Sequence, residues 1–517
     1  MTQLLQHLVE RQAARRPEAT AIVYGAKRLS YGELDAAANR LARALAEAGC
    51  RKGDRACFLY PKKPAAMVWM LGILKAGAMH VPLDLASPAE RLRRIVTSCE
   101  PRFILAAGPA ASLALQLQDL AKICWIEQTV PGGLRPAFTL QDVARESSEA
   151  MACETSPQDP AHILFTSGST GIPKGVVITH ANVMAFVDWG LKHFGLNHTD
   201  RVSGHTPLHF DLSTYDIFGA YAAGAELHVV PLETALLPHR LAEWIRISRL
   251  TQWFSVPSVL NYMAKVDAVR HNDFPELRRV MWCGEVLPTP VLIHWMKRLP
   301  HARFTNLYGP TETTIASSYY DIPACPEDPS EHIPIGSACD GEEILVINDE
   351  IHIGGLGLSP GYWRDPVKTA AAFLPHPHRP GERIYRTGDL GRVRPDGLLE
   401  LIGRADTQIK SRGYRIELGE IESALASLPA LRESAVVAIP SDGFEQWQIC
   451  CAYVSMKTTS PGMLRTELAR LIPSYMMPSR WQAYGALPRN ANGKVDRPRL
   501  KQDFQQRIEC RQPSFET

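Results

Sequence analysis

The chain has 517 residues, of which 56 are Lys or Arg and 54 are Asp or Glu, so its formal net charge is only +2. A nearly neutral chain has no long-range field that selects polyanions, which excludes nucleic acid and an anionic membrane surface as main partners. Eleven cysteines, an odd number spread along the chain, indicate reduced thiols and a cytoplasmic location. No apolar run reaches the roughly 18 residues of a membrane span.

The first part of the chain predicts alternating helices and strands. Residues 1–20 lack a charged head followed by an apolar run, and they predict an amphipathic helix that ends near Pro17 rather than a secretory leader. A helical pattern at 31–49 is followed by short apolar runs at 56–60 and 103–108. This alternation is typical of parallel α/β layers.

The alternation continues with a strand predicted at 226–232, a helix at 241–248 and, over 278–285, a strand that enters a loop. A single hydrophobic core stops growing at about 250–300 residues, so several lobes are expected. We interpret residues 1–404 as one large multi-sheet α/β domain.

The pattern changes after Gly388-Asp389. Residues 398–413 read as strand, turn and strand, and residues 416–428 as a helix. We therefore expect a small α+β domain at 405–517, with a hinge between Gly403 and Asp406.

A run rich in Gly, Ser and Thr follows the apolar strand predicted at 162–165. Its hydroxyls and unobstructed backbone N–H groups suit a polyphosphate, and Lys174 adds a positive charge. It is not a Walker loop, because Gly175 and Val176 follow the lysine where a Ser or Thr would hold a metal. A flexible surface loop is the plain alternative. The expected phosphate ligands are Thr166, Ser167, Gly168, Ser169, Thr170, Gly171 and Lys174.

Nine motifs carry a resemblance that extends over nearly the whole chain. In this order they resemble the adenylate-forming (AMP-binding) superfamily, which includes acyl-CoA ligases, luciferases and the adenylation domains of nonribosomal peptide synthetases. The resemblance implies a large N-terminal adenylation core and a mobile C-terminal lid. The motifs are LSYGELDAAANRLA from Leu29, LKAGAMHVPLD from Leu74, TSGSTGIPKGVVITH from Thr166, FDLSTYDIF from Phe210, NLYGPTETT from Asn306, YRTGDLGR from Tyr385, GRADTQIKSRGYRIELGEIE from Gly403, LIPSYMMPSRW from Leu471 and NANGKVD from Asn490.

The resemblance implies ATP and Mg²⁺ as cofactors and assigns residues to them. Tyr308 would stack on adenine, the Thr311 hydroxyl would meet the α-phosphate, and the Glu312 carboxylate would hold Mg²⁺, roles that suit these side chains. Asp389 would accept hydrogen bonds from both ribose hydroxyls. The further nucleotide contacts implied are Gly284, Gly309 and Arg404.

The resemblance also makes Lys494 the lysine of the adenylation step. An ammonium between the substrate carboxylate and the α-phosphate offsets their repulsion and fixes their geometry. In relatives the lid rotates about a hinge residue, here Asp406, so that a thioester step follows with Arg412, Gly413 and Arg415 near the thiol's arm.

Asp211 stands where amino-acid-activating relatives hold the substrate's α-ammonium. An anion in an apolar pocket predicts a cationic substrate group, and helix capping is the alternative role for this Asp. No other expected pocket residue except Lys494 is charged, and Tyr215 and Met281 take up volume, so a small or medium neutral amino acid is expected, of the proline, cysteine, alanine, serine or glycine type. By resemblance the pocket comprises Asp211, Leu212, Tyr215, Ser255, Met281, Cys283, Leu307, Ile315 and Ala316.

Three features complete the sequence interpretation. The segment 336–352 is shorter than in the family and suggests a trimmed surface hairpin. His205 and His209 have zinc-pair spacing, but Pro207 breaks the helix that such a pair needs, so both are expected to border the acyl pocket. No carrier segment follows Lys494, which predicts a free-standing enzyme that loads the phosphopantetheine thiol of a separate carrier protein in secondary-metabolite (antibiotic) biosynthesis.

Two other functions are compatible with the same motifs. An acid:CoA ligase would use coenzyme A in place of the carrier, but Asp211 counts against it. A catalytically silent scaffold would be expected to have lost Lys494, Glu312 or the 166–174 loop, and all three are present.

Overall fold

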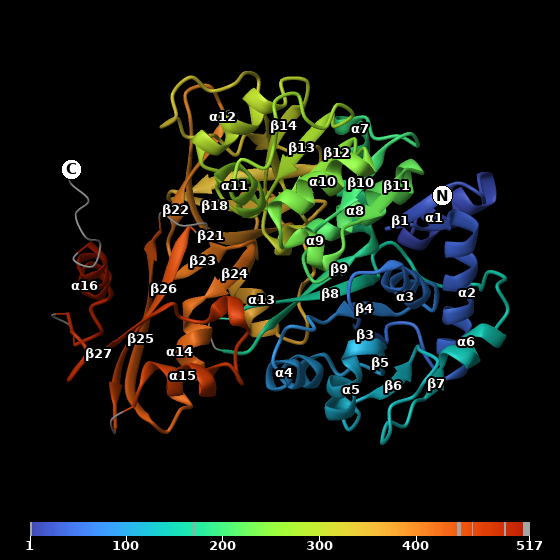
Figure 1. Ribbon diagram of the computed structural model, residues 1–517, viewed down its shortest axis with the longest axis horizontal. Helices are drawn as coiled ribbons and strands as arrows, with labels where there is room; N and C mark the ends of the chain where they lie inside the picture. Colours follow the sequence, from blue (N-terminus) through green and yellow to red (C-terminus); the bar gives the residue numbers. More distant parts are fainter. Residues whose placement is uncertain (1–2, 169–170, 442–445, 457–458, 491–492, 510–517) are drawn as a thin grey trace. The chain divides into compact units, whose positions relative to one another are not determined.

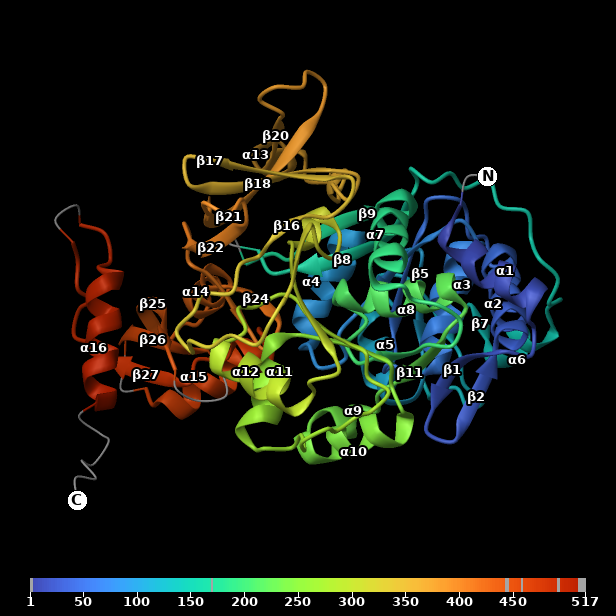
Figure 2. The same ribbon diagram turned by 90° about the horizontal axis from the view of Figure 1, so that it is seen from above.

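The computed structural model describes residues 3–168, 171–441, 446–456, 459–490 and 493–509. They form two compact units, drawn in Figure 1 and, after a turn of 90°, in Figure 2. The first unit comprises residues 1–85, 96–165 and 175–405, and the second comprises residues 86–95, 166–174 and 406–517. No helix in the part of the chain described has the length and hydropathy of a membrane span.

A nine-stranded sheet forms the centre of the first unit. Its six middle strands, from β14 to β1, are parallel, and β15, β16 and β2 pair antiparallel at the two edges. In spatial order the strands are β16 (Ser337–Ala338), β15 (Ser318–Asp321), β14 (Arg303–Tyr308), β13 (Arg279–Trp282), β12 (Gln252–Ser255), β10 (Arg201–Gly204), β11 (Glu226–Val229), β1 (Thr20–Tyr24) and β2 (Lys27–Ser30).

A second sheet has eight strands, with a parallel run from β4 to β7 through β3, β5 and β6. Its spatial order is β19 (Gly361–Tyr362), β9 (Lys174–Thr179), β8 (Pro160–Thr166), β4 (Met79–Pro82), β3 (Arg55–Leu59), β5 (Phe103–Ala106), β6 (Lys122–Trp125) and β7 (Phe138–Thr139).

A third, antiparallel sheet contains the shortened segment. The turn at Asn348 and Asp349 has φ of 51° and 64°, the left-handed pair that a two-residue hairpin requires. It joins Ile347 directly to its pairing partner Glu350, so the segment forms a hairpin, as expected. The strands are β17 (Glu342–Ile347), β18 (Glu350–Gly355), β21 (Arg383–Val393), β20 (Phe373–Pro375) and β22 (Leu399–Arg404).

Helices pack on these sheets, and their ends follow local signals. A capping box between Ser30 and Glu33 starts α2, and Gly195 ends α7 in the left-handed conformation. The helix α8 is buried along residues 212–221, as expected for a helix that is apolar on most of its faces. The helices are α1 (Leu5–Arg15), α2 (Tyr31–Glu47), α3 (Pro64–Lys75), α5 (Ala111–Leu117), α6 (Leu140–Arg145), α7 (His180–Phe194), α8 (Leu212–Ala223), α9 (Leu232–Ala235), α10 (Pro238–Ser248), α11 (Pro257–Lys265), α12 (Thr289–Arg298) and α13 (Pro366–Ala372), with short 3₁₀ turns η1 (Gly108–Ala110) and η2 (Thr311–Thr313).

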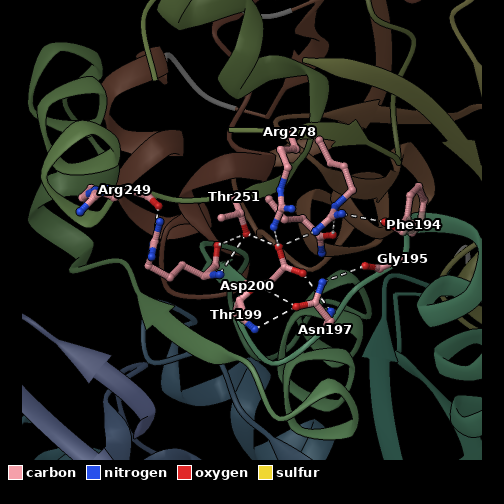
Figure 3. A network of polar contacts seen from close by, with 11 residues as sticks. Phe194, Gly195, Asn197, Thr199, Asp200, Arg249, Thr251 and Arg278 are labelled. Carbon is pink, nitrogen blue, oxygen red and sulfur yellow. Dashed lines mark hydrogen bonds and ion pairs between the residues drawn. The ribbon is translucent and has the colours of Figure 1, made fainter. Parts of the chain in front are cut away.

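An ion and hydrogen-bond network fixes the amino ends of β10, β12 and β13 (Figure 3). The Asp200 carboxylate, fully buried, accepts hydrogen bonds from Thr251 Oγ1 at 2.6 Å, Arg278 Nη2 at 2.6 Å and Arg279 Nη2 at 2.7 Å. The Asn197 N–H donates to its other oxygen at 2.9 Å. A buried carboxylate with this many donors is well compensated for its loss of water, so the network stabilises the start of the parallel strands.

The second compact unit is built mainly from the C-terminal part of the chain. Two of its contacts join distant segments: Arg91 Nε lies 3.2 Å from Glu420 Oε1, and the Ser167 hydroxyl donates to the Arg415 carbonyl at 2.6 Å. The helix α4 (Ala89–Cys99) begins in this unit and ends in the first. The remaining elements are β23 (Gln408–Ser411), β24 (Tyr414–Glu417), α14 (Leu418–Ala426), β25 (Leu431–Pro440), β26 (Trp447–Ser455), α15 (Pro461–Leu468), η3 (Ser474–Met476), β27 (Arg480–Ala483) and α16 (Arg497–Glu509).

The predicted α/β multi-sheet body is confirmed, as are the helices and strands expected along it, with two differences. The strand expected at 226–232 ends at Val229, because Pro231 and the short helix α9 follow. The helix expected from 416 begins at Leu418, because residues 414–417 pair as β24 with β23.

Candidate active site

The carboxyl end of β14 delivers the first group of predicted nucleotide residues. Tyr308 is the last residue of the strand and is buried, and its hydroxyl donates to Asp389 Oδ2 at 2.8 Å. Burial and the Asp389 charge raise the pKa of Tyr308 well above its usual value, so the hydroxyl stays a donor. An added Cβ at Gly309 would lie 2.6 Å from Ala316 Cα, so only glycine permits this close passage of the two backbone segments.

Asp389 and Arg404 face each other across the pair β21 and β22. They are register partners, and Arg404 Nη1 donates to Asp389 Oδ1 at 2.5 Å. The Asp389 N–H donates to Thr387 Oγ1 at 3.0 Å. The structure therefore brings Tyr308, Asp389 and Arg404 together in one hydrogen-bonded group, in which a carboxylate is held by a phenol and a guanidinium.

Glu312 lies in the η2 turn directly after Tyr308 and is fully buried. Its Oε1 accepts a hydrogen bond from the Tyr362 hydroxyl at 2.8 Å, and its backbone carbonyl accepts one from Ser359 N–H at 2.9 Å. Thr311 precedes it and is partly exposed. Among the residues with described positions, no three His, Cys, Asp or Glu side chains are grouped closely enough to hold a metal.

The backbone after Glu312 is strained. Thr314 and Ile315 have φ of 59° and 71°, a region that β-branched residues rarely adopt and that is found where the surroundings enforce it. The Thr314 hydroxyl donates to the Gly357 carbonyl at 2.7 Å. This bond helps to hold Ile315 and Ala316, two of the predicted pocket residues, in place. Neither the strain nor the Tyr362 contact was evident from the sequence.

The Gly-rich loop connects β8 and β9. The Thr166 hydroxyl oxygen is buried and has no hydrogen-bond partner among the described residues, which is the state expected of a group that awaits a ligand. An added Cβ at Gly168 would lie 2.1 Å from the Ile172 carbonyl oxygen, and Gly171 has φ of +80°, so both positions require glycine. Ser169 and Thr170 lie outside the described residues.

Asp211 precedes α8 at its N-cap position. Its side chain makes no capping hydrogen bond to the helix, so the alternative reading of this residue as a helix cap is wrong. The Asp211 side chain is half-buried. A carboxylate that does not cap its helix is consistent with a role toward a ligand.

The other predicted pocket residues meet at the carboxyl ends of the parallel strands. Ser255 ends β12, Cys283 follows β13 and Leu307 lies near the end of β14. The Cys283 thiol lies 3.8 Å from the Ile315 carbonyl oxygen. Gly284, with φ of +97°, turns the chain away from β13. The members of this group that share one buried cluster are Leu212, Tyr215, Met281, Cys283, Leu307, Ile315 and Ala316.

A buried polar group beside α8 was missed by sequence reasoning. Both Asp216 carboxylate oxygens are buried without a hydrogen-bond partner among the described residues, and burial raises the pKa of Asp216 well above its usual value. The Lys62 ammonium donates to the Thr206 carbonyl at 2.7 Å, and burial lowers the pKa of Lys62 to about 7. The sequence analysis used this segment only as part of the FDLSTYDIF motif, so it gave no indication of this group.

One of the two histidines expected beside the pocket, His205, packs within the core of the first unit. His205 packs against Trp253 with ring centroids 5.0 Å apart. Burial lowers the pKa of His205 to about 3, so its imidazole is neutral at physiological pH.

Lys494 and Asp406 belong to the second compact unit. Lys494 is exposed in a tight turn, where its N–H donates to Asn490 Oδ1 at 3.0 Å and its carbonyl accepts from Asn490 N–H at 2.8 Å. Asp406 is the first residue of the unit's C-terminal segment, and its Oδ1 accepts from Gln408 N–H at 3.0 Å. The turn fixes the backbone of Lys494 and leaves its long side chain outside.

Two family models match the chain. The model described as AMP-binding enzyme matches residues 9–363, and the model described as AMP-binding enzyme C-terminal domain matches residues 420–494.

Individual relatives agree with these matches. Surfactin synthase subunit 2 of Bacillus subtilis is 35% identical over 510 residues, and the match covers 96% of this chain and 14% of that protein. The chain therefore spans about one seventh of that relative. The Vibrio cholerae adenylation domain AlmE, solved in complex with glycyl-adenosine-5'-phosphate, is 27% identical with a TM-score of 0.82, covering 97% of this chain and 98% of that one.

A third relative is a protein with two named domains. Holo-PA1221, described as an NRPS protein containing adenylation and PCP domains bound to a vinylsulfonamide inhibitor, is 27% identical with a TM-score of 0.80, covering 96% of this chain and 84% of that one. The matched family models, the identity to a peptide synthetase subunit and the two-part fold all agree. The chain belongs to the AMP-binding enzyme family, the adenylate-forming ligases, and within it is related to the adenylation domains of nonribosomal peptide synthetases.

Proposed function

We propose that the chain uses ATP to activate a small or medium neutral α-amino acid as an aminoacyl-adenylate, with release of pyrophosphate. The aminoacyl group then passes to the phosphopantetheine thiol of a carrier protein. The observation that carries this proposal is the position of the half-buried Asp211 carboxylate at the start of α8, in the same unit as the Tyr308, Asp389 and Arg404 group.

The proposed nucleotide contacts follow from the groups available. The Asp389 carboxylate would accept from the ribose hydroxyls, and the bond from Arg404 holds it in position. The Tyr308 ring would stack on adenine, with Gly284 and Gly309 allowing a close approach of the backbone. The Thr166 hydroxyl, which has no hydrogen-bond partner among the described residues, would donate to a phosphate oxygen, with the rest of the 166–174 loop and Lys174 around the polyphosphate.

Glu312 fits a magnesium ligand. Mg²⁺ in nucleotide sites is bound by one or two carboxylates, the phosphates and water, which agrees with a single buried carboxylate that the Tyr362 hydroxyl orients. The ion would neutralise charge on the phosphates. Thr311 would donate a hydrogen bond to the α-phosphate from the same turn.

In the proposed reaction, a substrate carboxylate oxygen attacks the α-phosphorus of ATP, and the bond to the pyrophosphate oxygen breaks. Lys494 would lie between the two negatively charged groups and stabilise the charge that develops. A Lys side chain on a turn of the mobile lid suits a group that is needed for one step only, and rotation about Asp406 would remove it before the thioester step.

The proposed amino acid class rests on the pocket. Asp211 would pair with the α-ammonium, and Leu212, Tyr215, Ser255, Met281, Cys283, Leu307, Ile315 and Ala316 would surround the side chain. All of these except Asp211 are uncharged and buried. An apolar pocket discriminates by volume rather than by charge, so charged amino acids are expected to fail.

ATP–pyrophosphate exchange, measured with the twenty amino acids and with sets of aryl and fatty acids, tests the proposal. We expect exchange with one or a few small neutral amino acids. Exchange only with acids that lack an α-amino group would favour an acid:CoA ligase. Exchange with none of them would favour a scaffold without catalysis.

A further inference from the structure

The ring of Tyr215, a proposed pocket residue on α8, packs against a glycine of the neighbouring helix α7. The helices α7 and α8 pack side by side (Figure 2). At Gly190 of α7, an added Cβ would lie 2.6 Å from Tyr215 Cε2, 2.7 Å from its hydroxyl oxygen and 2.8 Å from its Cζ. Real Cβ atoms do not approach a ring this closely. The observed position of Tyr215 is therefore possible only because residue 190 is a glycine, which has no side chain.

The ring is enclosed on its remaining core-facing sides. Phe186 of α7 meets it edge to face with centroids 5.2 Å apart, and Phe254 of β12 does so at 6.2 Å. On its own helix, an added Cβ at Gly219 would lie 3.1 Å from Tyr215 Cε2. Tyr215 has no exposed surface.

The far end of Tyr215 is directed toward the amino half of β13. The Arg279 guanidinium is near enough to lower the pKa of Tyr215 against the larger, opposite effect of burial. Residues two apart on a strand share one face, so Met281 lies on the face of β13 that Arg279 presents. The Tyr215 ring thus occupies a slot between α7 and β12, and it belongs to the same buried cluster as Met281 and Cys283.

We infer that Gly190 is a specificity-determining residue: by leaving this slot open, it keeps the Tyr215 ring out of the amino acid pocket and sets the size of side chain that is accepted. The inference rests on the proposed function, because it takes Tyr215 as a pocket residue. A methyl group at residue 190 pushes the ring away from α7. Phe186, Phe254 and Gly219 block the lateral directions, so the ring moves toward Met281 and Cys283 and reduces the pocket.

The test is Gly190→Ala, with ATP–pyrophosphate exchange measured for L-proline, L-cysteine, L-alanine and glycine. The wild type's preferred amino acid is compared with the next smaller one. We expect the kcat/KM ratio of larger to smaller substrate to fall roughly ten-fold or more, since one methylene in a tight pocket discriminates by about 10–200-fold. Where glycine is the preferred substrate, the expected result is a rise in its KM of similar size.

The same substitution in a Tyr215→Leu background separates the inference from a general packing defect. Without a ring to displace, Gly190→Ala should change the ratio by less than about two-fold, so that the double-mutant cycle shows coupling between the two positions. Equal changes in both backgrounds, or an unchanged ratio in the single variant, would overturn the inference. Exchange by the wild type with no amino acid would instead contradict the proposed function.

Two comparisons complete the test. Gly462→Ala in α15 is the control, because the nearest described atom outside its chain neighbours and the helix backbone is the Ser460 hydroxyl oxygen at 3.8 Å, and it should leave the ratio unchanged. Where Gly190→Ala fails to fold, Tyr215→Leu alone provides the test, because removal of the ring should raise the ratio of larger to smaller substrate. An unchanged ratio in Tyr215→Leu would overturn the inference.

Discussion

Polar side chains lie at both ends of the parallel strands β10, β12 and β13, but the two ends differ in the hydrogen bonds that these side chains make within the protein. At the amino ends, Asp200 is buried and accepts from an amide, a hydroxyl and two guanidinium groups. At the carboxyl ends, Asp211 stands at the start of α8, and the buried hydroxyl of Thr206 has no partner among the described residues.

This difference separates a framework from a site. A buried polar group with all its hydrogen bonds made stabilises one arrangement, whereas groups left without protein partners at the carboxyl ends of parallel strands are typical of ligand sites in open α/β sheets. The comparison predicts that substitutions at the amino ends change stability and that substitutions at the site change catalysis.

The largest expected effect is that of Lys494→Ala. Loss of the ammonium removes charge stabilisation that is needed only during adenylation, so ATP–pyrophosphate exchange should fall roughly 10²–10³-fold. Thioester formation from a preformed adenylate, measured with a carrier protein, should be nearly unaffected. Lys501→Ala, an exposed lysine on α16, is the matched control. Equal loss of both steps would contradict a rotating lid.

Asp200→Asn tests the framework. The substitution leaves Arg278 and Arg279 without their anion, and breaking a buried ion pair in this way costs about 3–5 kcal/mol of the free energy of unfolding. Urea denaturation measures the loss, and the KM for ATP of the folded variant should stay within two-fold. Asp396→Asn, which breaks an exposed pair with Arg394, should cost less than about 1 kcal/mol.

Glu342 lies between the framework and the site in character. Its carboxylate is buried like that of Asp200, but it has no cationic partner in the residues described around it. Its Oε1 accepts from Gly357 N–H at 2.7 Å, and burial raises the pKa of Glu342 from 4.5 to about 8. Between these values the unfolded chain releases the proton and the folded chain keeps it, so stability falls as pH rises from about 4.5 to about 8.

Glu342→Gln replaces this carboxyl by a group that does not titrate. Its effect on the free energy of unfolding should therefore be more stabilising at pH 7.5 than at pH 4.5, by an amount on the order of 2 kcal/mol. Urea midpoints at the two pH values measure this difference. Glu149→Gln, at an exposed position, is the control. A variant whose advantage does not grow with pH would show that Glu342 is ionised in the folded protein.

The smallest effect is expected from Tyr308→Phe. The variant keeps the ring and removes the hydrogen bond to Asp389, which should raise the KM for ATP roughly three- to ten-fold. Tyr484→Phe removes a comparable bond to Asp503 in the second unit and should leave that KM unchanged. A kcat that falls while KM stays constant would place Tyr308 at the reacting phosphate rather than at the base.

Sequence patterns predicted the helices and strands of the framework better than the contacts that hold the site residues in place. The apolar run at 162–165 and the helical pattern at 31–49 predicted elements that the structure contains, because each rests on a local pattern of apolar residues. The hairpin in 336–352 was expected from the resemblance to the family, and the structure contains it. The hydrogen bond between Tyr362 and Glu312 joins residues 50 positions apart. The close contact of the Tyr215 ring with Gly190 depends on how the helices α7 and α8 pack. Such contacts leave no local pattern.

The most direct test of the account compares the preferred amino acid with its analogue lacking the α-amino group, in ATP–pyrophosphate exchange by the wild type and by Asp211→Asn. If the carboxyl ends of the strands build an amino acid site, the wild type should prefer the amino acid at least roughly 100-fold in kcat/KM, because a site built for a charged group rejects a substrate that leaves it unpaired. The preference should nearly vanish in Asp211→Asn. Equal preference in both proteins would show that Asp211 does not bind the ammonium and would contradict the central claim.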